Sequence, residues 1–114
     1  MSADCLFCGI VARDIPSTVV HETDRMLAFR DIAPQAPVHV VVIPKEHHAD
    51  VSALTASDPA LAGELLATVA EVAASEGLER GFRVVFNTGS HGGQTVFHVH
   101  AHLLGGRAMT WPPG

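Results

Sequence analysis

Residues 98–104 restrict the fold most, because three histidines there alternate with apolar residues in the order His-Val-His-Ala-His-Leu-Leu. Side chains of a β-strand point alternately to the two faces of a sheet. The alternation therefore predicts a strand over Val96–Leu104 that carries the histidines on one face and packs its apolar residues into a core. The three histidines are His98, His100 and His102. Burying titratable imidazoles is costly unless they are paired or used, so chemistry is expected at this strand.

The rest of the chain predicts an α+β domain in which an antiparallel sheet is covered by one long helix. Apolar residues recur at helical spacing between Asp58, which can cap the helix ahead of Pro59, and Gly77, which can end it. A short helix over Leu6–Ala12 precedes the sheet. Besides the histidine strand, four strands are predicted, over Thr18–His21, Met26–Asp31, Val38–Ile43 and Phe82–Phe86.

Length and composition restrict the class of protein. The 114 residues suffice for one domain with a real core, and no repeat or linker divides them. A net charge of −5 with seven scattered Lys and Arg residues argues against nucleic-acid binding, which needs clustered basic side chains. No apolar run approaches the ~20 residues of a membrane span, and the first residues lack the features of a signal peptide. We therefore expect a cytoplasmic protein without a membrane or nucleic-acid partner.

Three histidines on one face suit either a metal site or phosphoryl chemistry. Two histidines at i and i+2 can share an ion, but His98 and His102 lie ~13 Å apart along a strand, so all three cannot easily do so. A catalytic zinc would need a ligand from elsewhere, and the nearest preceding acid is Glu79. A neutral imidazole can instead attack phosphorus and form a covalent intermediate. The nucleophile interpretation fits better, and zinc-dependent hydrolysis stays open as an alternative.

A glycine-rich loop over residues 87–95 directly precedes the histidine strand. Its three glycines permit close backbone approach and positive φ, so that amide groups can turn toward an anion. Gln94 and Thr95 add neutral hydrogen-bond donors. The loop lacks the Gly-Lys-Ser/Thr of a Walker motif. Many such loops are only turns, but in this position the loop predicts a phosphate cradle.

Residues 98–104 resemble the histidine triad signature, in which three histidines alternate with apolar residues. Four further stretches are similar to the histidine triad nucleotide-binding (Hint) branch of the histidine triad (HIT) family. They are residues 28–39, 42–47, 92–97 and 105–114, the last of which ends in Trp-Pro-Pro-Gly. The resemblance covers nearly the whole chain from Cys5 onward. It implies a single HIT domain over residues 1–114, with about five antiparallel strands, one long helix and a short N-terminal helix.

The resemblance assigns the histidines by position. His100 is implied to be the nucleophile that attacks the α-phosphorus of a nucleotide. His102 is implied to contact the phosphate and to assist proton transfer, and His39 to orient the nucleophile from behind. His98 completes the triad, and whether its role is catalytic, structural or metal-binding stays open.

The resemblance also implies a purine nucleotide site. Asp31 would hold the ribose hydroxyls, and Trp111, reaching over from the partner in a homodimer, would shape the leaving-group side. Apolar side chains would wall the purine, namely Phe7, Ile10, Phe29 and Ile32. Loop residues would surround the phosphate, namely Asn87, Gly93, Gln94 and Thr95. Without the resemblance, the purine wall would be interpreted as core.

The two cysteines, Cys5 and Cys8, have the C-x-x-C spacing of half a metal site. The resemblance implies a structural zinc bound by these cysteines together with His47 and His98. Such a zinc would tie the N-terminal helix to the sheet. The alternative is a pair of reduced thiols in a short helix.

The sequence therefore predicts an enzyme, a purine nucleoside phosphoramidate hydrolase that releases a nucleoside monophosphate such as AMP through a covalent nucleotidyl-histidine intermediate. No cofactor is required for this catalysis. Two alternatives stay open, a nucleotide-binding interaction module with little turnover and a zinc-dependent phosphohydrolase. Two residues depart from the family pattern and bear on substrate preference. Thr95 replaces a common serine, and His91 stands where an acidic residue is common.

Overall fold

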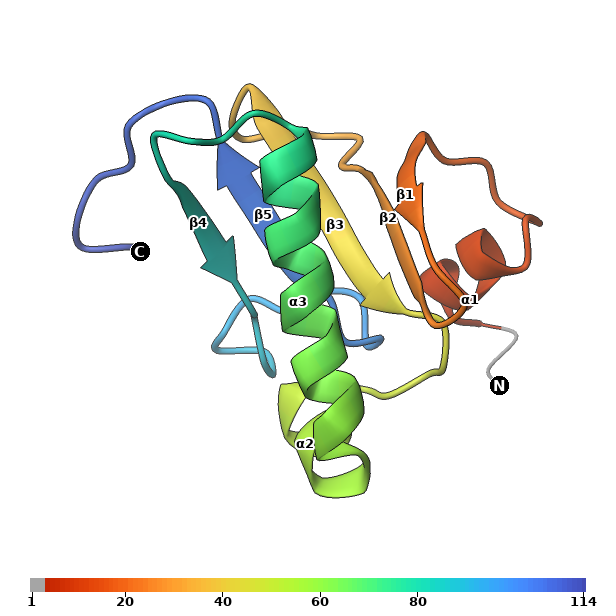
Figure 1. Cartoon of the computed structure of the whole chain (residues 1–114). Helices are drawn as coiled ribbons and strands as arrows, with labels where there is room; N and C mark the ends of the chain where they lie inside the picture. Colours follow the sequence, from red (N-terminus) through yellow and green to blue (C-terminus); the bar gives the residue numbers. More distant parts are fainter. Residues whose placement is uncertain (1–3) are drawn as a thin grey trace.

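The computed structural model describes residues 4–114, which form one five-stranded sheet and three helices (Figure 1). All neighbouring strands are antiparallel, in the order β1-β2-β3-β5-β4. The strands are β1 (Val19–Glu22), β2 (Met26–Arg30), β3 (Val38–Pro44), β4 (Phe82–Val85) and β5 (Ala101–Gly105). The predicted fold class is confirmed, and β1 and β4 are the edges of the sheet.

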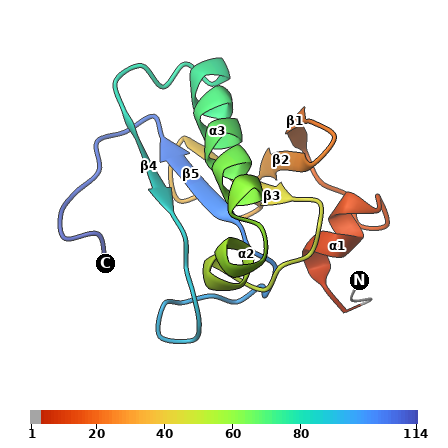
Figure 2. The same cartoon turned by 60° about the horizontal axis from the view of Figure 1, so that its bottom comes forward.

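The helices lie on two sides of this sheet. They are α1 (Leu6–Val11), α2 (Val51–Ser57) and α3 (Pro59–Ser75). The long helix α3 crosses one face of the sheet, and α1 lies beside the β1–β2 end, apart from α2 and α3 (Figures 1 and 2). No helix within residues 4–114 is long and apolar enough to span a membrane.

The start of the long helix is confirmed in detail. The Asp58 carboxylate accepts a hydrogen bond from the N–H group of Leu61, and Pro59 occupies the first turn. The short helix α2 before it was not predicted. Leu54 is its only buried residue, so α2 has no apolar stripe that could mark it in the sequence.

Two apolar layers pack against opposite faces of the sheet. The larger layer joins Leu65 of α3 to Val40 and Val42 of β3. The smaller layer joins Phe7 of α1 to Val41, on the other face. Neighbouring residues of β3 thus enter different layers, as strand geometry requires. The smaller layer is the one that borders the histidines.

The histidine strand begins later than Val96, where the sequence predicts its start. β5 starts at Ala101, so the first two histidines precede it. The N–H group of Val99 donates to the carbonyl oxygen of His48 over 2.7 Å and not to β3. At the same level β3 ends at Pro44, whose nitrogen carries no hydrogen. The ladder of the sheet therefore cannot extend along the whole predicted strand.

The predicted division between the two faces is confirmed. The apolar residues of the segment belong to the layer beneath α3, namely Val99, Ala101 and Leu103. The histidines between them face the smaller layer. There Phe7 packs edge-on against His98 and His100, with ring centroids 6.0 and 5.0 Å apart. An interrupted strand thus keeps the side-chain alternation of a complete one.

Candidate functional site

Histidines from three parts of the chain gather on this face and form two clusters. The first, called the cysteine cluster below, consists of Cys5, Cys8, His47 and His98. The second, called the aspartate cluster, consists of Asp31, His39 and His102. Within each cluster the possible ligand atoms lie within 4.8 Å of one another. His100 stands between the two, because it separates His98 from His102 along the chain.

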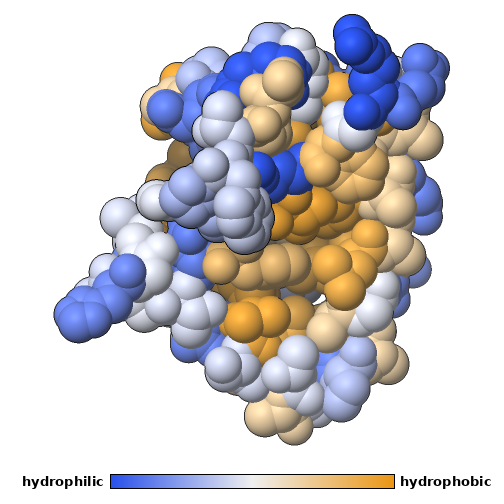
Figure 3. Space-filling model, turned by 90° about the vertical axis from the view of Figure 1, so that its left-hand side faces the viewer, coloured by the Kyte–Doolittle hydropathy of each residue, from blue (hydrophilic) through white to orange (hydrophobic). Residues whose placement is uncertain are grey.

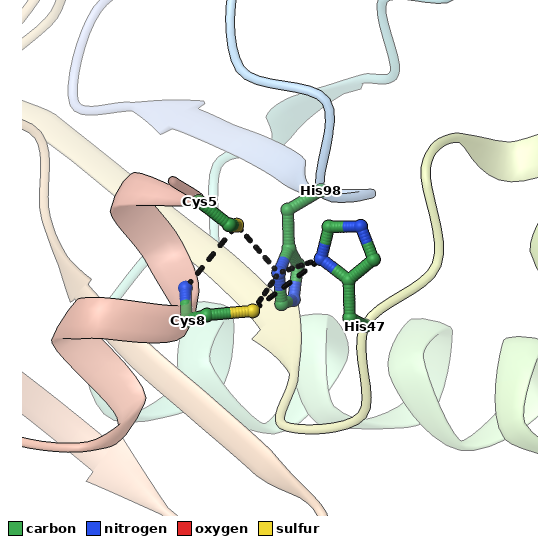
Figure 4. Close-up of side chains that lie close together, drawn as sticks. All are labelled: Cys5, Cys8, His47 and His98. Carbon is green, nitrogen blue, oxygen red and sulfur yellow. Dashed lines mark hydrogen bonds between the residues drawn. The ribbon is translucent and has the colours of Figure 1, made fainter. Parts of the chain in front are cut away.

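The cysteine cluster joins α1 to the loop after β3 and to the segment before β5 (Figure 4). Cys5 caps α1, and its Sγ accepts the N–H group of Cys8 over 3.3 Å. Nδ1 of His98 lies 3.4 Å from Sγ of Cys5 and 3.6 Å from Sγ of Cys8. Nδ1 of His47 lies 3.4 Å from Sγ of Cys8 and 3.2 Å from Nδ1 of His98. The four residues grouped from the sequence therefore converge.

The nitrogen that His98 presents to the sulfurs carries a lone pair. Nε2 of His98 donates to the carbonyl oxygen of Pro44 over 2.8 Å, so Nδ1 of the neutral ring is unprotonated. Burial lowers the pKa of His98 to about 4, which keeps the ring neutral at pH 7. A tetrahedral zinc would hold its nitrogen and sulfur ligands ~3.3–3.6 Å apart. The observed separations have this size, so the residues fit a zinc ion.

The aspartate cluster combines Asp31, at the start of the loop between β2 and β3, with His39 of β3 and His102 of β5. The N–H group of Asp31 donates to the carbonyl oxygen of His39 over 3.0 Å and closes the loop. Nε2 of His39 lies 2.9 Å from Nδ1 of His102 and 3.4 Å from Oδ2 of Asp31. The same carboxylate oxygen lies 3.9 Å from Nδ1 of His102. By distance alone, this cluster would also suit a metal ion.

The hydrogen bonds of His39 argue against a metal at that point. The N–H group of Gln35 donates to Nδ1 of His39 over 3.0 Å, so the proton of the neutral ring is on Nε2. A metal on Nε2 would drive this proton to Nδ1, where it would oppose the Gln35 N–H group. His39 therefore donates its Nε2 proton to Nδ1 of His102. His102 in turn carries its own proton on Nε2, so His39 and His102 form a hydrogen-bonded chain.

His100 has its proton on the other nitrogen. Its Nδ1 donates to the carbonyl oxygen of His98 over 2.8 Å, which leaves a lone pair on Nε2. Burial lowers the pKa of His100. Burial, with the charges of His100 and His39, lowers the pKa of His102 to about 4. Both rings are thus neutral at pH 7, and their centroids lie 4.9 Å apart. In such a pair one ring can attack an electrophile and the other can donate a hydrogen bond to a leaving group.

Three of the four residues expected to wall a purine lie together. Phe7, Ile10 and Phe29 belong to the smaller apolar layer and are buried. Phe7 packs edge-on against Phe29 at a centroid distance of 5.4 Å, and it also contacts His100. Ile32 differs, because its side chain is fully exposed. The structure therefore brings three apolar residues together beside His100 and leaves the fourth at the surface.

The glycine-rich loop is braced from inside by the buried side chain of Gln94. Oε1 of Gln94 accepts the N–H group of Gly89 over 3.0 Å. Nε2 donates to the carbonyl oxygens of Ala49 and Val96 over 2.8 and 3.1 Å. These bonds use both amide hydrogens of the side chain. Gln94 thus holds the loop and does not offer a donor to a phosphate, which corrects the expectation from the sequence.

The remaining residues expected at the site lie at or near the surface. Asn87 is half-buried, and Gly93 and Thr95 are exposed. Gly93 has a φ of +85°, a conformation that glycine adopts without strain. His91 at the tip of the loop is exposed, and Trp111 in the C-terminal tail is 82% exposed. Within residues 4–114, neither of these two side chains belongs to either cluster.

A hollow of about 370 Å³ lies elsewhere, between the turn after α3 and the start of the C-terminal tail. Its lining residues are Gly77, Leu78, Arg80, Gly81, Gly106, Arg107 and Ala108. None of them is a nucleophile, a carboxylate or a metal ligand of the kinds in the two clusters. The reactive groups of the described chain are therefore concentrated at the histidines and not at this hollow.

Comparison with known proteins settles the family. The model of the HIT domain matches residues 12–109, which is most of the chain. The chain belongs to the HIT family. An uncharacterised HIT-like protein of Synechococcus elongatus is 57% identical over the full length of both chains. The 14 kDa zinc-binding protein of Brassica juncea is 50% identical over 97% of this chain and 100% of its own.

Two further relatives strengthen the placement within the HIT family. The adenylylsulfatase HINT1 of Arabidopsis thaliana is 50% identical over 96% of this chain and 76% of its own. The crystal structure of a HIT family hydrolase from Legionella pneumophila has a TM-score of 0.94 and 53% identity, covering 97% of this chain and 100% of the other. The expected HIT fold and Hint-like branch are confirmed.

The HIT signature identifies the histidines but not the backbone groups that fix their tautomers. The carbonyl of Pro44 holds His98, the carbonyl of His98 holds His100, and the N–H group of Gln35 holds His39. None of these backbone contacts was predicted. Every residue offers such groups, so a sequence pattern carries no direct signal for them. The only hint was the pair of prolines that restricts the loop before β3.

Proposed function

We propose that this HIT protein hydrolyses purine nucleoside phosphoramidates and releases a nucleoside monophosphate. The observation that carries the proposal is the pair of opposite tautomers at His100 and His102. The His98 carbonyl holds the Nδ1 proton of His100, which leaves Nε2 ready to attack. His39 donates to Nδ1 of His102, which leaves an N–H group on Nε2 of His102 that can donate a hydrogen bond to the leaving group.

In the first step, Nε2 of His100 attacks the α-phosphorus. A phosphorus–nitrogen bond to His100 forms while the bond to the leaving amine breaks. The departing nitrogen takes up a proton from water and leaves as a neutral amine, while the Nε2–H group of His102 donates a hydrogen bond to it as the bond breaks. The ring of His100 becomes positively charged, and the carbonyl of His98 stabilises this charge through the Nδ1 proton.

In the second step, a water molecule attacks the same phosphorus. The attacking water loses a proton to the solvent, and the bond between phosphorus and His100 breaks. The nucleoside monophosphate leaves, and His100 regains its lone pair. One water molecule is consumed for each bond that is cleaved.

Substrate binding follows from the groups around these histidines. We assign the purine to the surface formed by Phe7, Ile10 and Phe29, with the exposed Ile32 closing over the base. We assign the ribose to Asp31, whose Oδ1 is fixed by the N–H group of Ala33 over 2.8 Å. The phosphate would lie against the glycine-rich loop, near Asn87, Gly93 and Thr95, with Gln94 holding the loop in shape.

Two relatives support hydrolysis as the reaction class. The Arabidopsis relative is named an adenylylsulfatase, and the Legionella structure is described as a HIT family hydrolase. A sulfate leaving group departs as a stable anion, whereas an amine needs a proton in order to depart. Because the Nε2–H group of His102 can donate a hydrogen bond to a departing amine nitrogen, we place phosphoramidates above sulfate conjugates as substrates.

The test measures the release of nucleoside monophosphate by chromatography. Purified protein is incubated with adenosine 5′-phosphoramidate, its guanosine counterpart and adenylyl sulfate. We expect turnover of the phosphoramidates, with kcat/KM about tenfold above that for adenylyl sulfate. Faster hydrolysis of adenylyl sulfate would contradict the assignment of the leaving group. Binding of AMP in calorimetry without any turnover would support a nucleotide-binding module.

We further propose that the cysteine cluster binds a structural zinc ion. The support is the lone pair of His98 facing two sulfurs at ligand spacing, together with the zinc-binding relative from Brassica juncea. Bound zinc would tie α1, and with it Phe7, to the segment before β5. A chelator should therefore lower the melting temperature while the folded fraction keeps its initial rate. Loss of turnover before any loss of fold would support a zinc-dependent hydrolase.

We also propose that the protein is a homodimer that pairs along β4. β4 is an edge strand whose first residue, Phe82, is 45% exposed. Figure 3 shows apolar side chains gathered in a hollowed surface on the side of the molecule that carries β4 and the C-terminal tail. Such a face favours a second copy, whose Trp111 would then reach the leaving-group side. Light scattering should give a dimer for the wild type and a monomer for Phe82→Glu, and a monomeric wild type would contradict this proposal.

A further inference from the structure

The loop between β2 and β3 is shaped by its own hydrogen bonds. The Asp31 N–H group closes the loop on the His39 carbonyl, and Oδ1 of Asp31 accepts the N–H group of Ala33 over 2.8 Å. The side-chain amide of Gln35 donates to the carbonyl oxygen of Ala33 over 2.9 Å. These bonds bring the N–H group of Gln35 to Nδ1 of His39. One residue of the loop therefore decides which nitrogen of His39 carries the proton.

Arg107 holds the same residue from outside the loop. One terminal nitrogen of its guanidinium donates to the carbonyl oxygen of Gln35 over 3.0 Å. The other donates to the carbonyl oxygen of Ala108 over 3.0 Å, which fixes the side chain in this direction. Gln35 thus has a partner for its N–H group, its carbonyl and its side-chain amide. Of these partners, only Arg107 belongs to the segment after β5.

The chain beside Arg107 is pressed against the loop as well. β3 begins and β5 ends at the same end of the sheet, where Val38 pairs with Gly105 (Figure 1). A Cβ atom added to Gly106 would come within 2.9 Å of Cβ of Pro37, and Gly106 has a φ of +87°. A side chain at this position would therefore collide with the loop. The close approach sets Arg107 at the level of Gln35.

We propose that Arg107 is a positioning residue that acts through Gln35 to keep the proton of His39 on Nε2, and thereby also keeps the proton of His102 on Nε2. The kinetic part of this inference rests on the proposed function, whereas the tautomer of His39 can be measured without any substrate. Without the guanidinium, the carbonyl of Gln35 has no partner in the loop. The residue can then turn, and the N–H group that fixes His39 turns with it.

Three variants test the proposal. Arg107→Met removes the contact with Gln35, and Arg107→Lys keeps a positively charged donor. Arg80→Met is the matched control, because Arg80 lines the same hollow but has no hydrogen bond or ion pair within residues 4–114. The tautomer of His39 is read from two-bond ¹H–¹⁵N correlation spectra of labelled, substrate-free protein. The same spectra show whether each variant is folded.

We expect the wild type and Arg80→Met to hold His39 with its proton on Nε2. Arg107→Met should show a mixture of tautomers or a proton on Nδ1, and Arg107→Lys should restore the wild-type form in part. With a phosphoramidate substrate, Arg107→Met should lower kcat about tenfold and change KM less than about twofold, as expected when a catalytic group is misplaced but binding is kept. An unchanged tautomer in folded Arg107→Met would overturn the proposal. Absence of turnover in the wild type would instead remove the proposed function and leave the tautomer result to decide.

Discussion

The two clusters of this HIT protein have similar spacings but different chemistry. In the cysteine cluster, His98 gives its Nε2 proton to the carbonyl of Pro44 and presents a lone pair to two sulfurs. In the aspartate cluster, a backbone N–H group occupies Nδ1 of His39, so the ring presents a proton. A carbonyl partner thus leaves one imidazole with a lone pair that can bind a metal ion, and an amide partner makes another a hydrogen-bond donor.

The backbone partner also fixes different tautomers for His98 and His100, which lie two residues apart on one segment. The His98 residue offers its side chain to the cysteine cluster and its backbone carbonyl to Nδ1 of His100. His100 is thereby left with a lone pair on Nε2, although its burial resembles that of His98. Residue type and distance therefore do not distinguish the proposed zinc ligand, the proposed nucleophile and the histidine that donates to His102. The distinction comes from the backbone group that is hydrogen-bonded to the other nitrogen of each ring.

We expect the largest loss of activity from a substitution of His100. His100→Asn removes the attacking nitrogen, and we expect kcat to fall at least about a thousandfold because no covalent intermediate can form. His21→Asn is the control, since His21 lies on β1 at the edge of the sheet. Steady-state release of AMP from a phosphoramidate measures both. Turnover of His100→Asn near the wild-type rate would show that the nucleophile lies elsewhere.

We expect zinc binding to depend on the cysteine cluster and not on the aspartate cluster. Cys8→Ser removes one ligand of the cysteine cluster, and we expect zinc affinity to fall at least about a hundredfold. His39→Leu, which alters only the aspartate cluster, should leave the zinc content unchanged. Atomic emission of purified proteins and competition with a chromogenic chelator give the content and the affinity. Loss of zinc in His39→Leu would mean that the metal occupies the aspartate cluster.

We expect kcat to depend on the hydrogen bond that His39 donates to His102 and not on the size of the His39 side chain. His39→Leu removes the donor to His102, and we expect kcat to fall by about tenfold or more. His39→Gln can still donate to Nδ1 of His102 and should retain more activity than the leucine variant. Comparison of kcat for the two variants decides the question. Equal losses would indicate that His39 only fills space.

The last prediction concerns stability and pH. His102 has a pKa of about 4 in the folded chain, below its ordinary value of 6.5. Between these values the unfolded chain binds more protons, so the free energy of unfolding should fall as the pH drops from 6.5 to 4, by about 1.4 kcal/mol per pH unit from this group. Urea unfolding at several pH values measures the slope. His102→Asn should flatten it, and an equal slope in that variant would assign the effect to other groups.

Much of the fold was predictable because the decisive signals are local. Asp58 and Pro59 mark the start of α3, and the apolar run of β3 marks a central strand. The start of β5 was not predictable from its alternation, because the N–H group of Val99 bonds to His48, far away in the sequence. Helix α2 was missed because it buries only Leu54.

At the site, too, the sequence identified side chains but not the backbone contacts that depend on the fold. The four members of the cysteine cluster were grouped from the sequence through a family resemblance, and the structure brings them together. The roles of Gln35 and Pro44 depend on backbone groups, which every residue carries, so no pattern of side chains announces them. The amide of Gln94 was expected at the phosphate because its side chain is polar. Its actual partners are backbone carbonyls that only the folded loop brings within reach.

The most direct test of the division of roles is to trap the covalent intermediate. Protein mixed with an adenosine phosphoramidate is quenched in alkaline denaturant, which preserves phosphorus–nitrogen bonds to histidine, and its intact mass and peptides are measured. The account predicts one adenylyl group per active chain, attached to His100, and none in His100→Asn. Attachment to His98 or His102, or steady turnover without any adduct in rapid-quench samples, would contradict it.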